Sequence, residues 1–338
     1  MIGRKGSFGE VHFSPRPCWP IDTTYYVDRS CTDQDLRWLM HRLSGIGLTK
    51  INRSKTIPGL NRDDAYRLRL LLPPLAEQRR IAKVLDRAEE LRAKRGGALA
   101  QLDTLTQFVF LDIFGDPASN PKGWPVLPLR EVVKPGTIVT YGIVQAGEEY
   151  PGGGIPYIRT GDIADGEIVQ SGLRHTDPAI AVKFLRSRVE TGEIVMSIRA
   201  TVGTTALVPP RLDGANLTQG TARIAPGDFV ERTYLLQYLR SSAAQHWIKL
   251  QIKGATFREI TLSRLRQLPV LVPPLSAQSE FARRMAAMEK LRALHRESLS
   301  HLYGLFNALQ HRAFRGELFS EGIELQAVGK AVGTGTDQ

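Results

Sequence analysis

This chain contains the stretch Pro73-Pro74-Leu75-Ala76-Glu77-Gln78 and repeats it 200 residues later as Pro273-Pro274-Leu275-Ser276-Ala277-Gln278. Further positions match at the same spacing, among them Ala82, Glu89, Leu91, Leu102 and Phe114 with Ala282, Glu289, Leu291, Leu302 and Phe314. In each copy a short apolar segment leads through Pro-Pro, a common helix start, into a long amphipathic helix. The repeat therefore predicts two similar halves, and two similar halves suit a bipartite target.

Turn signals between periodic segments divide the chain into five parts. We predict a partial α/β domain at residues 1–72, a spacer helix at 73–117, a complete domain at 118–272, a second spacer helix at 273–318 and a disordered tail at 319–338. Short strands are expected at residues 11–13, 25–27, 155–158, 193–198 and 221–224, and helices at 34–43 and 234–250. The predicted fold class is α+β.

The first domain resembles only the second half of the later one. Residues 4–9 align with residues 198–203, and nothing ahead of them corresponds to residues 124–196. We therefore expect a truncated first domain with uncovered apolar surface and marginal stability. The sequence leaves open whether this reflects a gene truncation, a misplaced start or a natural half-length arrangement.

The two spacer helices show a 3.5-residue apolar period, which predicts an antiparallel coiled-coil pair. The predicted seam runs through Ile81, Leu91, Leu102 and Leu105 in the first helix and through Phe281, Leu291, Leu302 and Leu305 in the second. Arg95 and His295 occupy equivalent seam positions. They form either a polar layer that fixes register or side chains that extend outward, and the sequence does not separate these alternatives.

Composition points to a polyanionic partner. The formal net charge is +11 and the pI is about 9.8, an excess that favours nucleic acid over a small neutral ligand, although some soluble proteins are merely basic. Cys18 and Cys31 show no metal-ligand spacing, and we find no signal peptide or membrane-spanning run. We expect a soluble, cytoplasmic protein.

Catalytic motifs are missing from the sequence. It has no phosphate-binding GxxxxGK[ST] loop, no amino-methyltransferase tetrapeptide and no HExxH or paired CxxC metal motif. The glycines of residues 3–9 and 152–154 read as turns, because neither run lies between a strand and a helix at dinucleotide spacing. We therefore expect no bound metal or cofactor and no catalysis by this chain.

Several motifs, weak individually, become specific through their order and duplication. They are Ile57-Pro58-Gly59-Leu60-Asn61-Arg62-Asp63, the two Pro-Pro-Leu stretches, Phe114-Gly115-Asp116-Pro117, Tyr157-Ile158-Arg159-Thr160-Gly161-Asp162-Ile163 and Ala313-Phe314-Arg315-Gly316-Glu317-Leu318. With them the chain resembles the specificity (S) subunit of a Type I restriction-modification system, over most of residues 1–318. The resemblance implies two target-recognition domains that read a split DNA site, and an antiparallel helix pair that docks methylation (M) and restriction (R) subunits. It also implies that S-adenosylmethionine, ATP and Mg²⁺ act on those partner subunits.

Candidate DNA contacts are the basic and amide side chains that fall in predicted loops. They are Lys5, Arg159, Arg174, Lys183, Arg186, Arg188, Arg199, Thr201, Asn216, Gln219, Arg223, Lys249, Lys253 and Arg258. Lys249, Lys253 and Arg258 cluster around a predicted turn at residues 254–256 and are the stronger phosphate candidates. For each of the others, an arginine or amide on the surface without DNA contact is an equal alternative.

The sequence therefore predicts a DNA-recognition subunit without catalysis of its own, in contact with duplex DNA and with M and R subunits, and able to self-associate. Two alternatives belong to other classes. A stand-alone DNA methyltransferase or nuclease should have shown a cofactor or metal motif. A coiled-coil scaffold without a DNA role would lack the arginine-rich loops and salt-dependent DNA binding.

Overall fold

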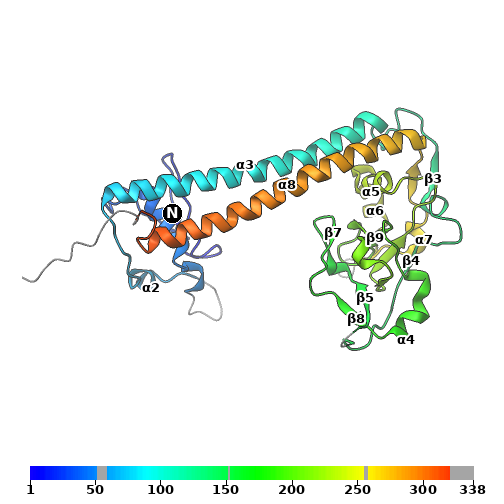
Figure 1. The fold of residues 1–338 in the computed structure, drawn as a ribbon, viewed down its shortest axis with the longest axis horizontal. Coiled ribbons are helices and arrows are strands. Elements are labelled where there is room, and N and C mark those ends of the chain that lie inside the picture. Colours follow the sequence, from blue (N-terminus) through cyan, green and yellow to red (C-terminus); the bar gives the residue numbers. More distant parts are fainter. Residues whose placement is uncertain (52–58, 151–152, 255–257, 320–338) are drawn as a thin grey trace, which may run out of the picture. The chain divides into compact units, whose positions relative to one another are not determined.

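The computed structural model describes residues 1–51, 59–150, 153–254 and 258–319 (Figure 1). The chain divides into two compact units, which we call unit 1 (Met1–Ala100 and Ala293–Gln338) and unit 2 (Gln101–Arg292). Two 40-residue helices, α3 (Leu75–Phe114) and α8 (Leu275–Phe314), are each divided between the two units, with one portion in unit 1 and the other in unit 2. Helices and strands are mixed, so the predicted α+β class is confirmed.

Unit 1 has few elements besides its portions of α3 and α8. They are β1 (Ile2–Gly3), β2 (Thr24–Tyr25), α1 (Leu36–Gly45), the 3-10 turn η1 (Leu48–Lys50) and α2 (Arg62–Tyr66). The strands β1 and β2 pair antiparallel. The apolar cluster of unit 1 is formed by Trp38 of α1 and by residues of α3 and α8, with Leu318 and Phe319 against it. The segment of residues 1–35 adds no side chain to this cluster.

Unit 2 contains the larger set of strands. They are β3 (Val126–Pro128), β4 (Thr140–Tyr141), β5 (Ile155–Ile158), β6 (Ile163–Ala164), β7 (Glu167–Ile168), β8 (Arg174–Thr176), β9 (Ile194–Ser197), β10 (Thr205–Leu207), β11 (Asn216–Leu217), β12 (Thr221–Ile224) and β13 (Pro269–Leu271). The main sheet has the order β10-β9-β12-β4, a second sheet has the order β11-β5-β8, and β13-β3 and β6-β7 form pairs. Separate buried clusters lie behind the main sheet and around the second sheet.

The helices of unit 2 are α4 (Pro178–Ala181), α5 (Arg232–Arg240), α6 (Ser242–Gln251) and α7 (Leu262–Leu265), with 3-10 turns at Leu129–Glu131, Thr160–Asp162, Val182–Ser187 and Pro210–Leu212. The single helix predicted at residues 234–250 is wrong. Ser241 has an extended backbone, ends α5 and caps α6 by accepting a hydrogen bond from the Ala244 amide. Serine competes well for such a capping position, so the chain turns there.

The sequence repeat is also a repeat of hydrogen bonds. In unit 1 the Gly3 amide donates to the Glu10 carbonyl, and the Gly9 amide donates to the Gly3 carbonyl, at 2.9 and 2.8 Å. In unit 2 the Ser197 amide donates to the Thr204 carbonyl, and the Gly203 amide donates to the Ser197 carbonyl, at 2.8 and 2.9 Å. The bridges Ile2–Val11 and Met196–Thr205 also correspond. The predicted correspondence of residues 4–9 with residues 198–203 is therefore confirmed as one hairpin built twice.

The repeated glutamine links each long helix to its domain. Gln78 and Gln278 are buried, and each donates to the carbonyl of the first proline of its own Pro-Pro, at 2.9 and 2.7 Å. Each also accepts an amide hydrogen bond from the residue that caps α1 or α5, Asp35 at 2.9 Å and Glu231 at 2.8 Å. The same short motif thus fixes helix entry in both units.

Helix α3 runs antiparallel to α8 within each unit, and the predicted 3.5-residue period holds. Ile81, Phe281 and Leu102 are buried and Leu302 is half-buried. The Arg95 guanidinium donates to His295 Nδ1 at 2.8 Å, so these two residues form the polar layer rather than extending outward.

The other column of the predicted seam is wrong by one residue. Leu91, Leu105, Leu291 and Leu305 are 37–49% exposed. Their neighbours Arg92, Thr106, Arg292 and Phe306 face inward instead. Arg92 lies 4.0 Å from the ring centre of Tyr303 and 4.6 Å from that of Phe306, and Arg292 donates to Thr106 at 2.8 Å. These contacts hold the arginines inside, which leaves the leucines on the surface.

Candidate nucleic-acid interface

The hairpin turn between β9 and β10 (residues 198–203, here the unit 2 turn) is a constrained surface feature of unit 2. Ala200 has a φ of +57°, a left-handed conformation that costs free energy in a residue other than glycine. Hydrogen bonds hold it: the Ala200 amide donates to the Arg258 carbonyl at 3.0 Å, and the Ser197 hydroxyl donates to the Arg199 carbonyl at 2.9 Å. Ala200 and Thr201 are exposed on this rigid base.

Positive charge gathers beside the unit 2 turn. Arg199 donates to Glu259 at 3.3 Å, and the backbone of Glu259 pairs with that of Lys253 at 2.9 and 3.1 Å. Lys253 and Arg258 are exposed and have no ion-pair partner within the part of the chain that the structure describes. The Arg199 Nε is buried and likewise finds no hydrogen-bond partner there. An anionic ligand would neutralise the charge of the exposed Lys253 and Arg258.

The structure brings several predicted residues to this turn. Arg199 and Thr201 belong to the turn, and the Arg258 carbonyl accepts a hydrogen bond from it. Lys253 pairs with Glu259 beside the turn, and Lys249 lies near the end of α6. Gln219 is next to Gly220, where a Cβ would lie 2.9 Å from Thr160 and 3.9 Å from Arg199. The Gly220 carbonyl accepts a hydrogen bond from the Ile198 amide at 2.8 Å. Residues 255 and 256 of the predicted turn at 254–256 lie outside the described residues.

Arg174, Lys183, Arg186 and Arg188 are exposed but belong to other elements. Arg174 is on β8 of the second sheet, and the remaining three lie in or next to the 3-10 turn at Val182–Ser187. No contact joins them to the unit 2 turn among the described residues. The DNA contact of these four residues stays a prediction.

Three predicted contacts have internal partners instead. Arg223 is 8% exposed, and its guanidinium donates to both carboxylate oxygens of Glu193 at 2.6 and 2.7 Å. Asn216 is buried and bonds Ser187 and the Leu217 amide. We remove Arg223 and Asn216 from the DNA contacts, because a buried side chain with its hydrogen bonds satisfied cannot reach a groove.

The third is Arg159, which donates to both oxygens of Asp162 at 2.7 and 3.0 Å while staying partly exposed. This hydrogen bonding raises the pKa of the Arg159 guanidinium, which therefore stays charged. The pair fixes the segment that contains Thr160 beside Gly220. We assign Arg159 to positioning this segment.

Unit 1 has an equivalent turn with a different charge balance. Lys5 occupies the place of Arg199 and pairs through its backbone with Gly59, where unit 2 has Glu259. No carboxylate therefore neutralises Lys5 from that position. Lys5 lines an open groove of about 540 Å³ together with Arg4, Asn61 and Arg62, of which the sequence identified only Lys5. The adjacent pair Arg4-Lys5 was the available signal for Arg4.

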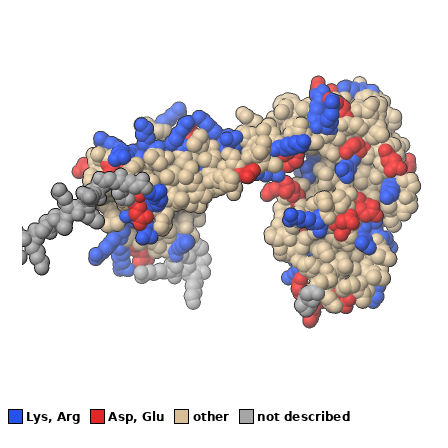
Figure 2. Space-filling model, in the orientation of Figure 1, with Lys and Arg blue, Asp and Glu red and all other residues tan. Residues whose placement is uncertain are grey.

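A further basic surface follows α3 in unit 1. Figure 2 shows Lys and Arg side chains gathered over this part of the molecule, where Arg79, Arg80, Lys83, Arg87 and Lys94 are exposed. Arg87 and Lys94 are both within 2.6 Å of Glu90, so this surface is partly neutralised. It can attract a polyanion at long range without specifying its sequence.

One cluster of possible metal ligands occurs among the described residues: His41, Asp86 and Glu89 of unit 1. Asp86 already accepts two hydrogen bonds from Arg37, at 2.6 and 3.0 Å, and lies 2.7 Å from His41. Burial alone would raise the pKa of the Asp86 carboxyl, but these hydrogen bonds outweigh it and lower the pKa. With an arginine already on its carboxylate, the cluster joins α1 to α3 rather than holding a cation.

Residues 121–302 match the family model of the Type I restriction modification DNA specificity domain. The chain belongs to this family. The predicted recognition as a Type I specificity subunit is thus confirmed, including its DNA-binding target-recognition class. Among the helices of the described residues, none combines the length and the apolar character needed to cross a membrane.

Curated relatives agree with this assignment. The chain is 26% identical to the EcoBI specificity subunit of Escherichia coli over 354 residues, which cover 95% of this chain and 74% of that protein. It is 24% identical to the putative MjaX specificity subunit of Methanocaldococcus jannaschii over 255 residues, which cover 70% of this chain and 56% of that protein.

Two solved structures share the fold. One, from work on complex assembly and conformational transition of the type I R-M system, has a TM-score of 0.54 at 23% identity and covers 84% of this chain and 72% of its own. The S subunit from M. genitalium has a TM-score of 0.52 at 14% identity, and the match covers 93% of this chain and 82% of that one. At these identities the likeness concerns the fold alone.

Proposed function

We propose that this specificity subunit binds duplex DNA and docks the methylation and restriction subunits of its complex. The observation that supports DNA binding best is the hairpin turn that both units build with the same hydrogen bonds and present with basic side chains, Lys5 in unit 1 and Arg199, Lys253 and Arg258 in unit 2. Two equivalent basic turns suit a bipartite site, because each can enter one groove segment.

Docking is supported by the exposed leucines of the helix pair. Leu91, Leu105, Leu291 and Leu305 face solvent at equivalent places of the two helices, and each is followed by a residue that faces inward. Apolar side chains repeated on a solvent face are typical of protein interfaces. In this proposal S-adenosylmethionine, ATP and Mg²⁺ belong to the partner subunits, and this chain contributes recognition without catalysis in the cytoplasm.

The test is equilibrium binding of the full chain to a pool of random duplexes over a range of salt concentrations. Lys253→Ala/Arg258→Ala should reduce affinity and lower the slope of log K against log salt by about 1–2, because each lost phosphate contact removes about one released counterion. The matched control is Arg211→Ala/Lys290→Ala, which removes the same charge from exposed positions outside the turn. Equal losses of DNA affinity in the two double variants would show that only the net charge matters, and would refute the turn as the contact surface.

A further inference from the structure

Unit 1 has one strand edge and one segment without secondary structure that carry no strand partner among the described residues. β2 pairs on one side only, with β1. Residues 69–71 precede Pro73-Pro74 as β13 precedes Pro273-Pro274, yet they form no strand. Leu71 is 71% exposed and Leu72 is 57% exposed, whereas Leu271 is 4% exposed. Exposed apolar edges are costly in a soluble protein and invite pairing with another chain segment.

In unit 2 both of the equivalent strand edges are covered by one continuous segment. β12 is the equivalent of β2, since Ile2 pairs with Tyr25 as Met196 pairs with Ala222. β4 covers its outer edge through Tyr141 and Thr140. β3 pairs with β13, and the Val272 amide donates to the Pro125 carbonyl at 2.8 Å. Residues 124–143 thus close both edges in a single pass.

The same segment also supplies core side chains. Leu129, Val132 and Val139 belong to the main buried cluster of unit 2. That cluster also contains Leu235 and Leu239, which occupy the places of Leu39 and Leu43 in unit 1. In unit 2 this part of the molecule is therefore fully packed.

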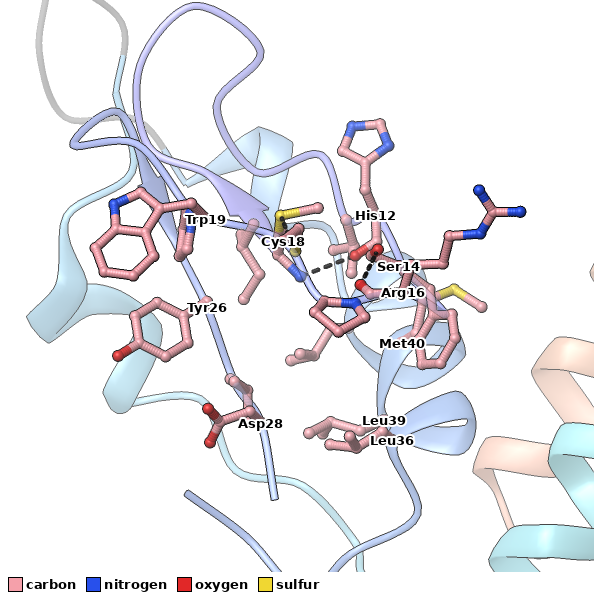
Figure 3. A pocket seen from close by; sticks show the side chains of 18 residues that line it. His12, Ser14, Arg16, Cys18, Trp19, Tyr26, Asp28, Leu36, Leu39 and Met40 are labelled. Carbon is pink, nitrogen blue, oxygen red and sulfur yellow. Dashed lines mark hydrogen bonds between the residues drawn. The ribbon is translucent and has the colours of Figure 1, made fainter. Parts of the chain in front are cut away.

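In unit 1, Leu39 and Leu43 instead line an open pocket of about 540 Å³. Figure 3 shows Trp19 and Tyr26 on one side of this pocket and Leu36, Leu39 and Met40 on the other. Trp19 is 93% exposed and Tyr26 is 56% exposed. Large aromatic side chains around an open apolar pocket are typical of a surface that another polypeptide covers.

We infer that unit 1 binds an extended polypeptide segment with the chemistry of residues 124–143, which adds one short strand to β2 and another to residues 69–71. The β2 edge, residues 69–71 and the exposed apolar side chains each point to this occupant. The equivalent places of unit 2 show the backbone pairing that it would make. Main-chain hydrogen bonds would supply affinity and the pocket would select apolar side chains, as in other cases of strand addition.

The test uses the full chain and a fluorescent synthetic peptide with the sequence of residues 124–143. Anisotropy should show saturable binding, and hydrogen exchange should slow at residues 23–27 and 66–72 when the peptide is present. Leu71→Asp should weaken binding at least tenfold, because it places a charge on the edge that the peptide covers. Leu294→Asp is the matched control, since Leu294 is also exposed in unit 1 but lies on α8, and the peptide affinity of this variant should equal that of the unchanged chain.

Three outcomes would overturn the inference. The first is no saturable binding at millimolar peptide. The second is equal binding by the Leu71→Asp chain. The third is a change of exchange confined to residues 126–141, which would mean that the peptide only replaces its own copy in unit 2. A peptide with proline at the positions of Leu127, Thr140 and Tyr141 lacks the strand amides and should not compete.

Discussion

Units 1 and 2 are built from the same repeated hairpin and long helices, and they differ in how many apolar side chains they bury. Trp38 of α1 meets Phe314 edge-on at 6.5 Å, and Tyr234 of α5 meets Phe114 edge-on at 4.7 Å, so each domain helix packs on the end of the other repeat's long helix. In unit 2 that contact is one part of a large core that also contains Phe110 and Phe281. In unit 1 the cluster around that contact is smaller, and only Trp38 and Leu39 join it from outside the long helices and the residues that follow α8. A duplicated frame therefore does not guarantee equal stability.

The first prediction compares these two aromatic contacts. Phe114→Ala should destabilise unit 2 by about 3–5 kcal/mol, because Phe114 is 1% exposed in a packed aromatic cluster. Phe314→Ala should cost about 1–2 kcal/mol in unit 1, because Phe314 is only half-buried. Native-state hydrogen exchange of α5 and α1 amides reports the two units separately. Equal costs would show that unit 1 is as well packed as unit 2.

The second prediction compares one strand position in the two sheets. Arg223 follows Ala222 on β12, and Tyr26 follows Tyr25 on β2, which is the equivalent of Ala222. Arg223 is 8% exposed, whereas Tyr26 is 56% exposed. Arg223→Met should cost about 3 kcal/mol or more, since it leaves the Glu193 carboxylate buried without its partner. Tyr26→Met should change stability by less than about 0.5 kcal/mol.

Urea denaturation of the full chain measures both substitutions. Adding Glu193→Met to Arg223→Met should recover most of the loss, because no buried charge then remains. A double variant as unstable as the single one would show that Arg223 acts through packing instead. If the folded double variant no longer bound specific DNA, Arg223 would again be a candidate DNA contact.

Much of this architecture could be predicted from the sequence, since the repeat at 200 residues, the Pro-Pro helix starts and the 3.5-residue period are local signals. The phase of the seam could not. In both repeats a leucine is followed directly by an arginine, as Leu91-Arg92 and Leu291-Arg292. The 3.5-residue period fits the positions of the leucines and those of the arginines equally well. The choice depends on contacts across the pair, such as Arg92 with Tyr303, which no single-helix pattern contains. Apolar residues were assumed to face inward, and here the arginines do.

The candidate site shows the same limit. Residue type predicted Arg199, Lys253 and Arg258 as candidate contacts, and the structure places Lys253 and Arg258 on the surface with Arg199 partly exposed. Residue type could not separate them from Arg223, because the carboxylate that neutralises Arg223 comes from Glu193, 30 residues earlier in the chain. An arginine is available to a ligand only if no carboxylate in the fold already holds it, and that information is tertiary.

The last and smallest expected effect tests the corrected seam in both units. Leu105→Asp in unit 2 and Leu305→Asp in unit 1 should each change stability by less than about 0.5 kcal/mol, because these side chains are 47% and 49% exposed and an aspartate there stays hydrated. Leu102→Asp, three residues away but 8% exposed, should cost several kcal/mol by burying an unpaired charge. Thermal unfolding followed by circular dichroism measures all three variants. The two exposed substitutions should also weaken binding of the methylation subunit if the leucines form its docking surface, since binding and stability are then separable. A larger thermal loss for Leu105→Asp than for Leu102→Asp would restore the original phase of the seam and remove the exposed leucines from the docking proposal.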